Sequence, residues 1–284
     1  MEKVKIIECP RDAMQGIKTF IPTSKKVEYI NRLLAAGFDT IDFGSFVSPH
    51  MIPQLADTAL VISQLDWSHE KSKLLAIIAN ARGAREASVF DQITYLGFPF
   101  SISETFQQRN TNASIEEAVK RVEEIQTICT NRNKQLVIFI SMAYGNPYDD
   151  PWSSDIVLHW TNKLAGMDIK IISLADTTGV AEPDVISLLF RETITAYPDI
   201  EFGAHFHTTT NTWREKVNGA YMNGCRRFDG AIKGYGGCPM AKDELTGNMP
   251  TENLISYLEE KGVGSEIDKT AFDMAMLYSE SVFA

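Results

Sequence analysis

Residues 4–15 read VKIIECPRDAMQ, and this stretch decides between the two α/β folds open to the chain. Its first half, residues 4–9, is a short apolar run of the kind that forms a buried strand. An open doubly wound sheet would follow its first strand with a glycine-rich turn that binds phosphate. The turn here, CPRDAMQ at residues 9–15, contains no glycine. The stretch therefore favours a (β/α)8 barrel.

The rest of the chain repeats this pattern of a short apolar run followed by an amphipathic stretch or a long loop. Buried strands are predicted at residues 4–9, 40–43, 73–79, 92–96, 135–141, 169–175, 201–207 and 227–231. Helices are predicted at residues 24–36, 53–64, 81–86, 114–132, 153–165, 182–197, 212–222, 251–261 and 269–283. We expect an α/β fold in which residues 1–284 form a single-domain (β/α)8 TIM barrel with an additional C-terminal helix.

The composition excludes several classes of partner. With 27 Lys and Arg against 37 Asp and Glu, the net charge is −10, which argues against nucleic-acid binding. No apolar run approaches the roughly 20 residues that cross a bilayer, and the start MEKVKII has no signal-peptide core. The four cysteines include no CxxC pair and do not make a disulfide framework. We expect a cytoplasmic protein without nucleic-acid or membrane partners.

The pair His205 and His207 is the sharpest local signal for chemistry. Side chains alternate along a strand, so both imidazoles point the same way, at the strand end where a barrel carries its active site. Asp12 follows the first strand, and a carboxylate with two imidazoles is a common metal-ligand set. The alternative is that the two histidines are only hydrogen-bonded groups beside the core residue Phe206.

Other polar residues at the same strand ends each have two interpretations. Arg11 offers forked donors for an oxyanion or enolate, or it forms an internal ion pair with Asp12. Asp42 lies in an otherwise apolar strand, where an unpaired carboxylate is costly. Asp176 is either an active-site group or the cap of a turn. Cys238, in the turn GGCP, is either a small turn residue or an acid/base thiol, whereas the other cysteines are expected to be packing residues: Cys9, Cys129 and Cys225.

Five segments together resemble the 3-hydroxy-3-methylglutaryl-CoA lyase family, which belongs to the metal-dependent TIM barrels that break or form carbon–carbon bonds. The segments are ECPRDAMQ (8–15), SFVSP (45–49), SLADTTGV (173–180), HFH (205–207), and GGCP (236–239) followed by Gly247-Asn248. The Arg-Asp and HxH elements are shared by the wider superfamily. SFVSP and GGCP point more narrowly to the lyase.

The resemblance implies metal-assisted cleavage of 3-hydroxy-3-methylglutaryl-CoA, or of a close 3-hydroxyacyl-CoA, to acetyl-CoA and acetoacetate by a homodimer. It also implies Mg²⁺ or Mn²⁺ as the divalent metal ion. By the same resemblance, the metal ligands are Asp12, His205, His207 and Asn248. Arg11 would stabilise the enolate and Cys238 would transfer a proton. Further active-site carboxylates would be Asp176 and Glu252, Lys18 would lie near the CoA, and Gln15 matches the first motif by position.

The chain also departs from that family. Asp42 stands where the family has Glu, Thr208 where it has Asp, and Ala13 where it has Gly. The stretch 239–247 is one residue longer than usual. Two alternatives therefore stay open: a related Claisen-condensing synthase or hydroxy-oxo-acid aldolase, and a non-catalytic metal-binding barrel.

Overall fold

The computed structural model describes residues 3–68, 71–237 and 246–283. Parallel strands β1 to β8 pair in chain order, β8 pairs with β1, and the sheet thereby closes into a barrel. These strands are β1 (Lys5–Glu8), β2 (Thr40–Ser45), β3 (Lys73–Ile77), β4 (Ile93–Ser101), β5 (Gln135–Ser141), β6 (Ile171–Asp176), β7 (Glu201–Thr208) and β8 (Arg227–Gly230). The predicted (β/α)8 barrel is confirmed.

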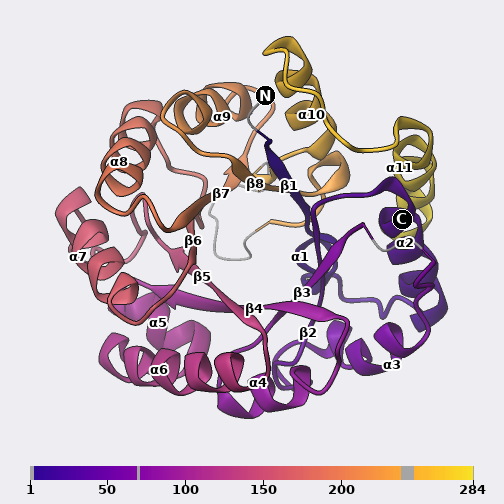
Figure 1. Cartoon of the computed structure of the whole chain (residues 1–284), viewed down its shortest axis with the longest axis horizontal. Coiled ribbons are helices and arrows are strands. Elements are labelled where there is room, and N and C mark those ends of the chain that lie inside the picture. Colours follow the sequence, from indigo (N-terminus) through magenta and orange to yellow (C-terminus); the bar gives the residue numbers. More distant parts are fainter. Residues whose placement is uncertain (1–2, 69–70, 238–245, 284) are drawn as a thin grey trace.

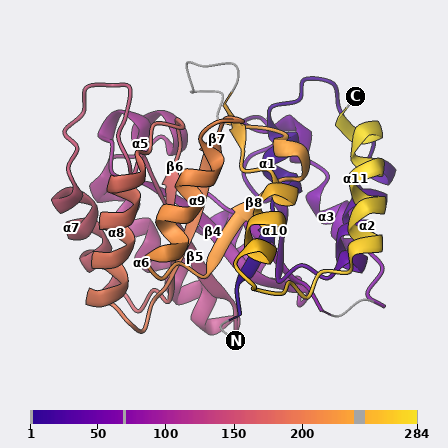
Figure 2. The same ribbon diagram turned by 90° about the horizontal axis from the view of Figure 1, so that it is seen from above.

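Helices form an outer ring around the strands (Figure 1). They are α1 (Pro10–Gln15), α2 (Thr23–Ala36), α3 (Thr58–Ser63), α4 (Ala81–Ala87), α5 (Glu104–Thr111), α6 (Ile115–Asn131), α7 (Ser154–Ala165), α8 (Pro183–Ala196), α9 (Trp213–Met222), α10 (Thr251–Glu260) and α11 (Lys269–Phe283). The predicted C-terminal helix is α11, which packs against α2. Seen from the side, the indigo start of β1 and the yellow end of α11 lie at opposite ends of the barrel (Figure 2).

Local sequence explains where the helices begin and end. The capping box predicted at Ser114 is present: its hydroxyl accepts the Glu117 N–H, and the Glu117 carboxylate accepts the Ser114 N–H. Ser153 caps α7 with its side chain alone, since its hydroxyl accepts the Ile156 N–H. Helix α2 ends at Gly37, whose φ of 80° is a conformation that glycine adopts without a steric penalty.

The structure corrects several predicted bounds. Arg11 and Asp12 do not end a strand: β1 stops at Glu8, and both residues lie on α1, which starts at Pro10 because proline suits the first helical position. The predicted helix 53–64 is a 3₁₀ turn, η1 (Pro53–Leu55), followed by α3. Helix α5, with the polar sequence ETFQQRNT, was not predicted because it lacks an apolar stripe.

The inside of the barrel is apolar on one side and polar on the other. Inward-facing residues of β3 to β6 form a compact apolar cluster: Leu75, Ile77, Tyr95, Val137 and Ile171. Strands β7, β8 and β1 contribute polar groups instead, among them His205 and Asp229. A separate, larger core fills the space between strands and helices. The functional chemistry is therefore concentrated on the β7–β8–β1 side.

A search of the described residues found no helix with the length and hydropathy needed to cross a membrane.

Candidate metal centre

Asp12, His205 and His207 converge at the end of the barrel where the strands finish. Asp12 comes from the first turn of α1, and both histidines come from β7. One ligand atom from each of the three lies within 4.8 Å of the others. Asp12 Oδ2 and His207 Nε2 are buried without a hydrogen-bond partner. Buried polar atoms are rarely left unsatisfied, and a carboxylate with two imidazoles suits a divalent ion, so the residues fit a metal.

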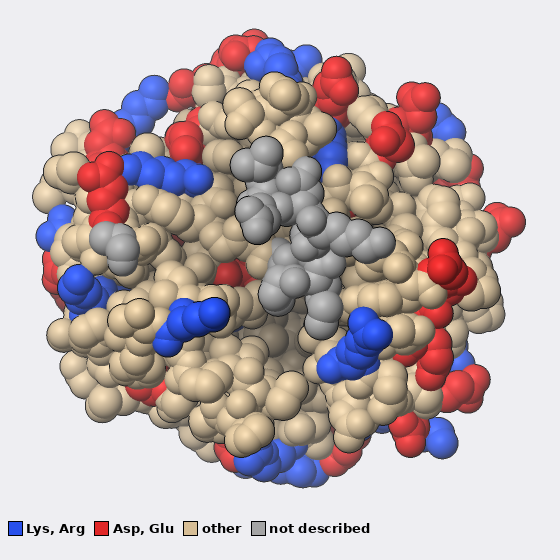
Figure 3. Space-filling view, turned by 180° about the vertical axis from the view of Figure 1, so that it is seen from behind, with Lys and Arg blue, Asp and Glu red and all other residues tan. Residues whose placement is uncertain are grey.

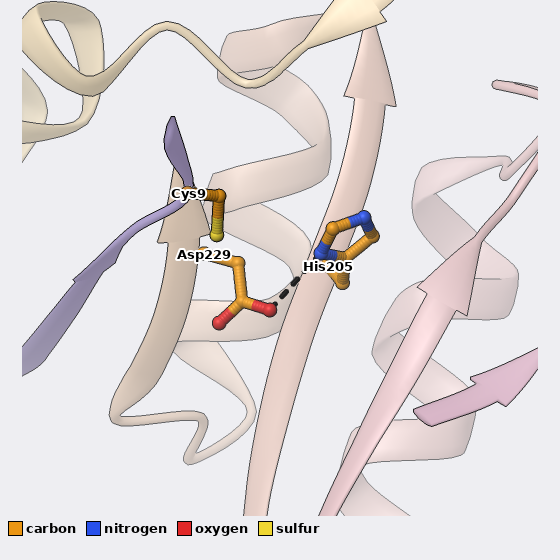
Figure 4. Close-up of side chains that lie close together, drawn as sticks. All are labelled: Cys9, His205 and Asp229. Carbon is orange, nitrogen blue, oxygen red and sulfur yellow. Dashed lines mark hydrogen bonds and ion pairs between the residues drawn. The ribbon is translucent and has the colours of Figure 1, made fainter. Parts of the chain in front are cut away.

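The other ring nitrogen of each histidine is occupied. His205 Nδ1 lies 3.0 Å from Asp229 Oδ2, with Cys9 beside the pair (Figure 4). His207 Nδ1 donates to the carbonyl oxygen of Thr177 at 2.9 Å. Burial acts to lower the pKa of His205, but the hydrogen bond and charge of Asp229 outweigh it and leave that pKa raised. Both rings are thus oriented with Nε2 as the free ligand atom.

Arg11 is held by two carboxylates. Its Nε donates to both Asp42 oxygens at 3.2 and 3.0 Å, and its Nη2 donates to Asp42 Oδ2 at 2.5 Å. Its Nη1 donates to Asp12 Oδ1 at 2.9 Å and to Gln15 Oε1 at 2.9 Å. The ion pair proposed for Arg11 and Asp12 is present, and it shares the guanidinium with Asp42. Asp42 is therefore a paired buried carboxylate.

The pKa values of the two carboxylates, Asp42 and Asp12, are shifted in opposite directions. Burial raises the pKa of Asp42 to about 6, despite the opposing charge of Arg11. Burial also acts to raise the pKa of Asp12, but Arg11 and the two imidazoles outweigh it, so that pKa lies well below its usual range. Asp12 is accordingly an anion near neutral pH, as a metal ligand needs to be.

A cavity of about 330 Å³ opens beside these groups. Arg11, Asp12, His205 and His207 line one part of it. Much of the remaining lining is apolar: Val47, Met51, Ile52, Ile77, Pro99, Phe106 and Phe139. Figure 3 shows one end of the molecule hollowed near its centre, with Lys, Arg, Asp and Glu side chains mainly toward the periphery. A small molecule entering this cavity would meet the polar cluster on one side and apolar side chains on the other.

Asn248 lies on a short strand, β9 (Gly247–Asn248), that the sequence did not reveal. β9 runs antiparallel to β7 and pairs Asn248 with His207. The side chain of Asn248 is buried, and its amide nitrogen donates to the Tyr235 carbonyl oxygen at 2.8 Å. Asn248 is thus the cross-strand neighbour of a candidate metal ligand.

Asp176 and Glu252 are engaged elsewhere. Asp176 ends β6, accepts the Ala181 N–H and forms an ion pair with Lys216 of α9, whose Nζ lies 2.6 Å from Asp176 Oδ2. Glu252, on α10, accepts the N–H of Lys233 at 3.0 Å. Neither is among the described residues that line the cavity.

Of two further predicted residues, one is described by the structure and does not belong to the cluster. Lys18 is exposed, shortly after the cavity residues Gln15 and Gly16. Cys238 lies outside the described residues. The other three cysteines are buried, as predicted: Cys9, Cys129 and Cys225.

Sequence reasoning did not find Asp229, Thr177 or Lys216. Asp229 carried a signal, because strand alternation places it on the same face as Arg227, inside the barrel. Thr177 acts through its backbone carbonyl, which no side-chain pattern indicates.

The fold and the site define a class: a (β/α)8 barrel with a carboxylate–imidazole cluster suited to a metal ion at the ends of its strands. The chain belongs to the HMGL-like family, whose profile it matches over residues 3–276. The family and the relatives below indicate a lyase.

Curated relatives and solved structures agree on this family. The cytoplasmic 3-hydroxy-3-methylglutaryl-CoA lyase of Rattus norvegicus is 32% identical over 268 residues, covering 94% of this chain and 77% of the relative. A 3-hydroxy-3-isohexenylglutaryl-CoA/hydroxy-methylglutaryl-CoA lyase of Pseudomonas aeruginosa is 30% identical, covering 95% and 89%.

Two solved structures superimpose on nearly the whole chain. The HMG-CoA lyase of Brucella melitensis has a TM-score of 0.91 at 28% identity and covers 99% of both chains. An HMG-CoA lyase of Acinetobacter baumannii, in complex with coenzyme A and 3-methylmalate, has a TM-score of 0.90 at 30% identity and covers 99% and 91%.

Proposed function

We propose that this protein cleaves 3-hydroxy-3-methylglutaryl-CoA, or a close 3-hydroxyacyl-CoA, to acetyl-CoA and acetoacetate. The observation that carries the proposal is the pair of unpartnered buried atoms, Asp12 Oδ2 and His207 Nε2, beside Arg11 in the cavity. Family membership and the names of the relatives support the same reaction. A retro-Claisen cleavage needs a polarised hydroxyl and a stabilised enolate, and this cluster offers groups for both.

Asp12, His205, His207 and Asn248 are the residues proposed to hold a divalent ion, Mg²⁺ or Mn²⁺. When bound, the ion supplies Lewis acidity that lowers the pKa of the substrate hydroxyl and orients it. The proposed acceptor of the hydroxyl proton is Asp12 or His205, and either would act as the base only while its ligand atom is not bound to the ion. Arg11 then stabilises the enolate oxygen, a charge that develops as the carbon–carbon bond breaks. Cys238 is the proposed donor of the proton that the enolate carbon takes up.

Three carboxylates act in this proposal by holding other residues in place and not by contacting the substrate: Asp42, Asp176 and Glu252. Asp42 fixes the direction of the Arg11 guanidinium through its paired contacts. Asp176 and Glu252 accept the backbone N–H groups of Ala181 and Lys233 and so hold those two segments in place. A shorter carboxylate at position 42 is consistent with this role because Oδ1 accepts from Arg11 Nε and Oδ2 accepts from Arg11 Nη2.

The acyl-CoA is proposed to enter with its acyl group at the cluster. The complex of the Acinetobacter relative with coenzyme A supports an acyl-CoA ligand. Lys18 is the proposed contact for the CoA phosphates, since it is exposed and follows the cavity residue Gly16. We further propose that residues 1–284 act as one domain, in a homodimer, in the cytoplasm.

The direct test is a cleavage assay with the metal-stripped protein. Acetoacetate release from 3-hydroxy-3-methylglutaryl-CoA should require added Mg²⁺ or Mn²⁺ and should be lost in Asp12→Asn. Asp273→Asn, which changes an exposed carboxylate of α11, is the matched control and should retain activity.

Other outcomes of the assay point to the alternatives. Turnover of free hydroxy-oxo acids, with none of the CoA ester, would replace the proposal with an aldolase. Condensation without cleavage would indicate a synthase. Tight metal binding without turnover of any CoA ester or free acid would indicate a non-catalytic barrel.

A further inference from the structure

The side chain of Asn248 is oriented by the segment that follows β8, the strand next to β7. Its amide nitrogen donates to the Tyr235 carbonyl oxygen at 2.8 Å, so the amide oxygen is the atom left to act as a ligand. Tyr235 follows η2 (Ile232–Gly234), the short 3₁₀ turn after β8. The position of the Tyr235 backbone therefore determines how Asn248 faces His207.

The backbone around Tyr235 needs support from outside the segment. Lys233 has a φ of 57° and Gly234 a φ of 65°. A non-glycine residue keeps a left-handed conformation only where its surroundings fix it. Two carboxylates provide part of that support: Glu8 accepts the Ile232 N–H at 2.8 Å, and Glu252 accepts the Lys233 N–H at 3.0 Å.

The rest of the support comes from the end of α11. The ring of Tyr235 stacks on the ring of Phe283, with centroids 4.4 Å apart and planes 22° apart. Phe283 also meets Tyr29 of α2 edge-on at 5.7 Å. Lys233 Nζ lies 2.5 Å from Glu280 Oε1, one turn earlier on α11. In Figure 1 the end of α11 lies beside α2, so the Tyr235 ring rests on a helix pair.

We propose that Tyr235 and Phe283 are positioning residues for the metal centre. Through the ring stack, α11 fixes the Tyr235 carbonyl, and the carbonyl fixes the amide of Asn248 toward the ion. The inference rests on the proposed function in one respect, that Asn248 is a ligand. It adds a role for a helix none of whose described residues lines the cavity. Outer contacts of this kind act on metal affinity because they hold the ligand in its binding orientation.

The test measures Mn²⁺ binding to the full-length metal-stripped protein by electron paramagnetic resonance of the free ion, with no substrate present. Phe283→Ala and Tyr235→Ala should weaken Mn²⁺ binding by about tenfold, the lower end of the range for lost outer contacts. Tyr235→Phe keeps both the ring and the carbonyl and should bind Mn²⁺ as the unchanged protein does. Phe283→Leu replaces Phe283→Ala if the alanine variant does not fold.

The matched control is Val282→Ala, which removes a buried side chain from the same helix without touching Tyr235. It should lower the Tm and leave Mn²⁺ affinity within about twofold, which separates loss of packing from loss of positioning. The double variant Tyr235→Ala/Phe283→Ala should bind Mn²⁺ no more weakly than either single variant, because each substitution alone already removes the same ring stack.

The possible failures are distinguishable. Unchanged Mn²⁺ affinity in both alanine variants, or equal weakening by Val282→Ala, overturns the positioning role alone. Failure of the unchanged protein to bind Mn²⁺, or binding that survives Asp12→Asn, overturns the metal centre and this inference with it.

Discussion

Replacing Lys216 by methionine would remove a buried cation from between the ends of β6 and β7. The ammonium lies 2.6 Å from Asp176 Oδ2 and donates to the carbonyl oxygens of Gly179 at 2.9 Å and His207 at 3.0 Å. The side chains of Lys216 and Asp176 are only 3% and 1% exposed. The substitution therefore leaves a carboxylate in the interior without its counter-charge.

The burial of this pair sets the size of the effect. Removing one partner of a buried ion pair costs about 3–5 kcal/mol, because the remaining charge stays desolvated. For a protein of this size, a loss of about 1 kcal/mol lowers the Tm by roughly 2–4 °C, so we expect Lys216→Met to lower it by about 6–20 °C. Adding Asp176→Asn removes the stranded charge and should recover much of that loss.

Thermal unfolding followed by circular dichroism near neutral pH provides the measurement. The exposed pair of Lys170 and Asp168 has the same separation of 2.6 Å, with side chains 59% and 77% exposed. Lys170→Met is therefore the matched control and should leave the Tm unchanged, because solvent screens that pair. The reasoning fails if Lys216→Met costs under about 1 kcal/mol, or if Asp176→Asn adds to the loss instead of reducing it.

Three further predictions concern Arg11, Glu8 and the reactivity of the cysteines. Arg11→Met should lower kcat for acyl-CoA cleavage by about 10²–10³-fold while Mn²⁺ binding persists, and near-normal kcat would move enolate stabilisation elsewhere. Burial raises the pKa of Glu8 to about 8, so its folded-state contribution is full at acid pH and declines as pH rises toward 8. Glu8→Gln should therefore flatten that decline in plots of Tm against pH, and a parallel decline would contradict it. In thiol mapping by mass spectrometry, Cys238 should be alkylated before the three buried cysteines, and acyl-CoA should slow its reaction.

Local patterns in the sequence predicted most of the barrel. Eight apolar runs predicted its strands, and strand alternation correctly placed His205 and His207 on one face. Alternation also explains why Asp176 is turned away, since its neighbours Ala175 and Thr177 line the cavity. The resemblance to a family suggested an active-site carboxylate there, but it contained no information on Lys216, which lies 40 residues further along the chain.

The parts that escaped prediction depend on contacts between distant residues or on very short elements. Arg11 and Asp42 are 31 residues apart, and only the packing of α1 against β2 reveals their pairing. β9 has two residues, too few for any periodic pattern. Helix α1 has only six residues, which is also too few for a helical pattern to show in the sequence. For that reason Arg11 and Asp12 were predicted to lie at the end of a strand.

Because β9 pairs with β7, the position of Asn248 does not depend on the length of the chain that precedes β9. Asn248 takes its place from the register with His207, and a shift of one residue would turn it to the opposite face. Insertions between residues 237 and 247 leave that register intact, whereas insertions within Gly247–Asn248 do not. Homologues could therefore vary this stretch in length while keeping Asn248 opposite His207. Evolution can therefore change the length of this stretch without moving Asn248 away from His207.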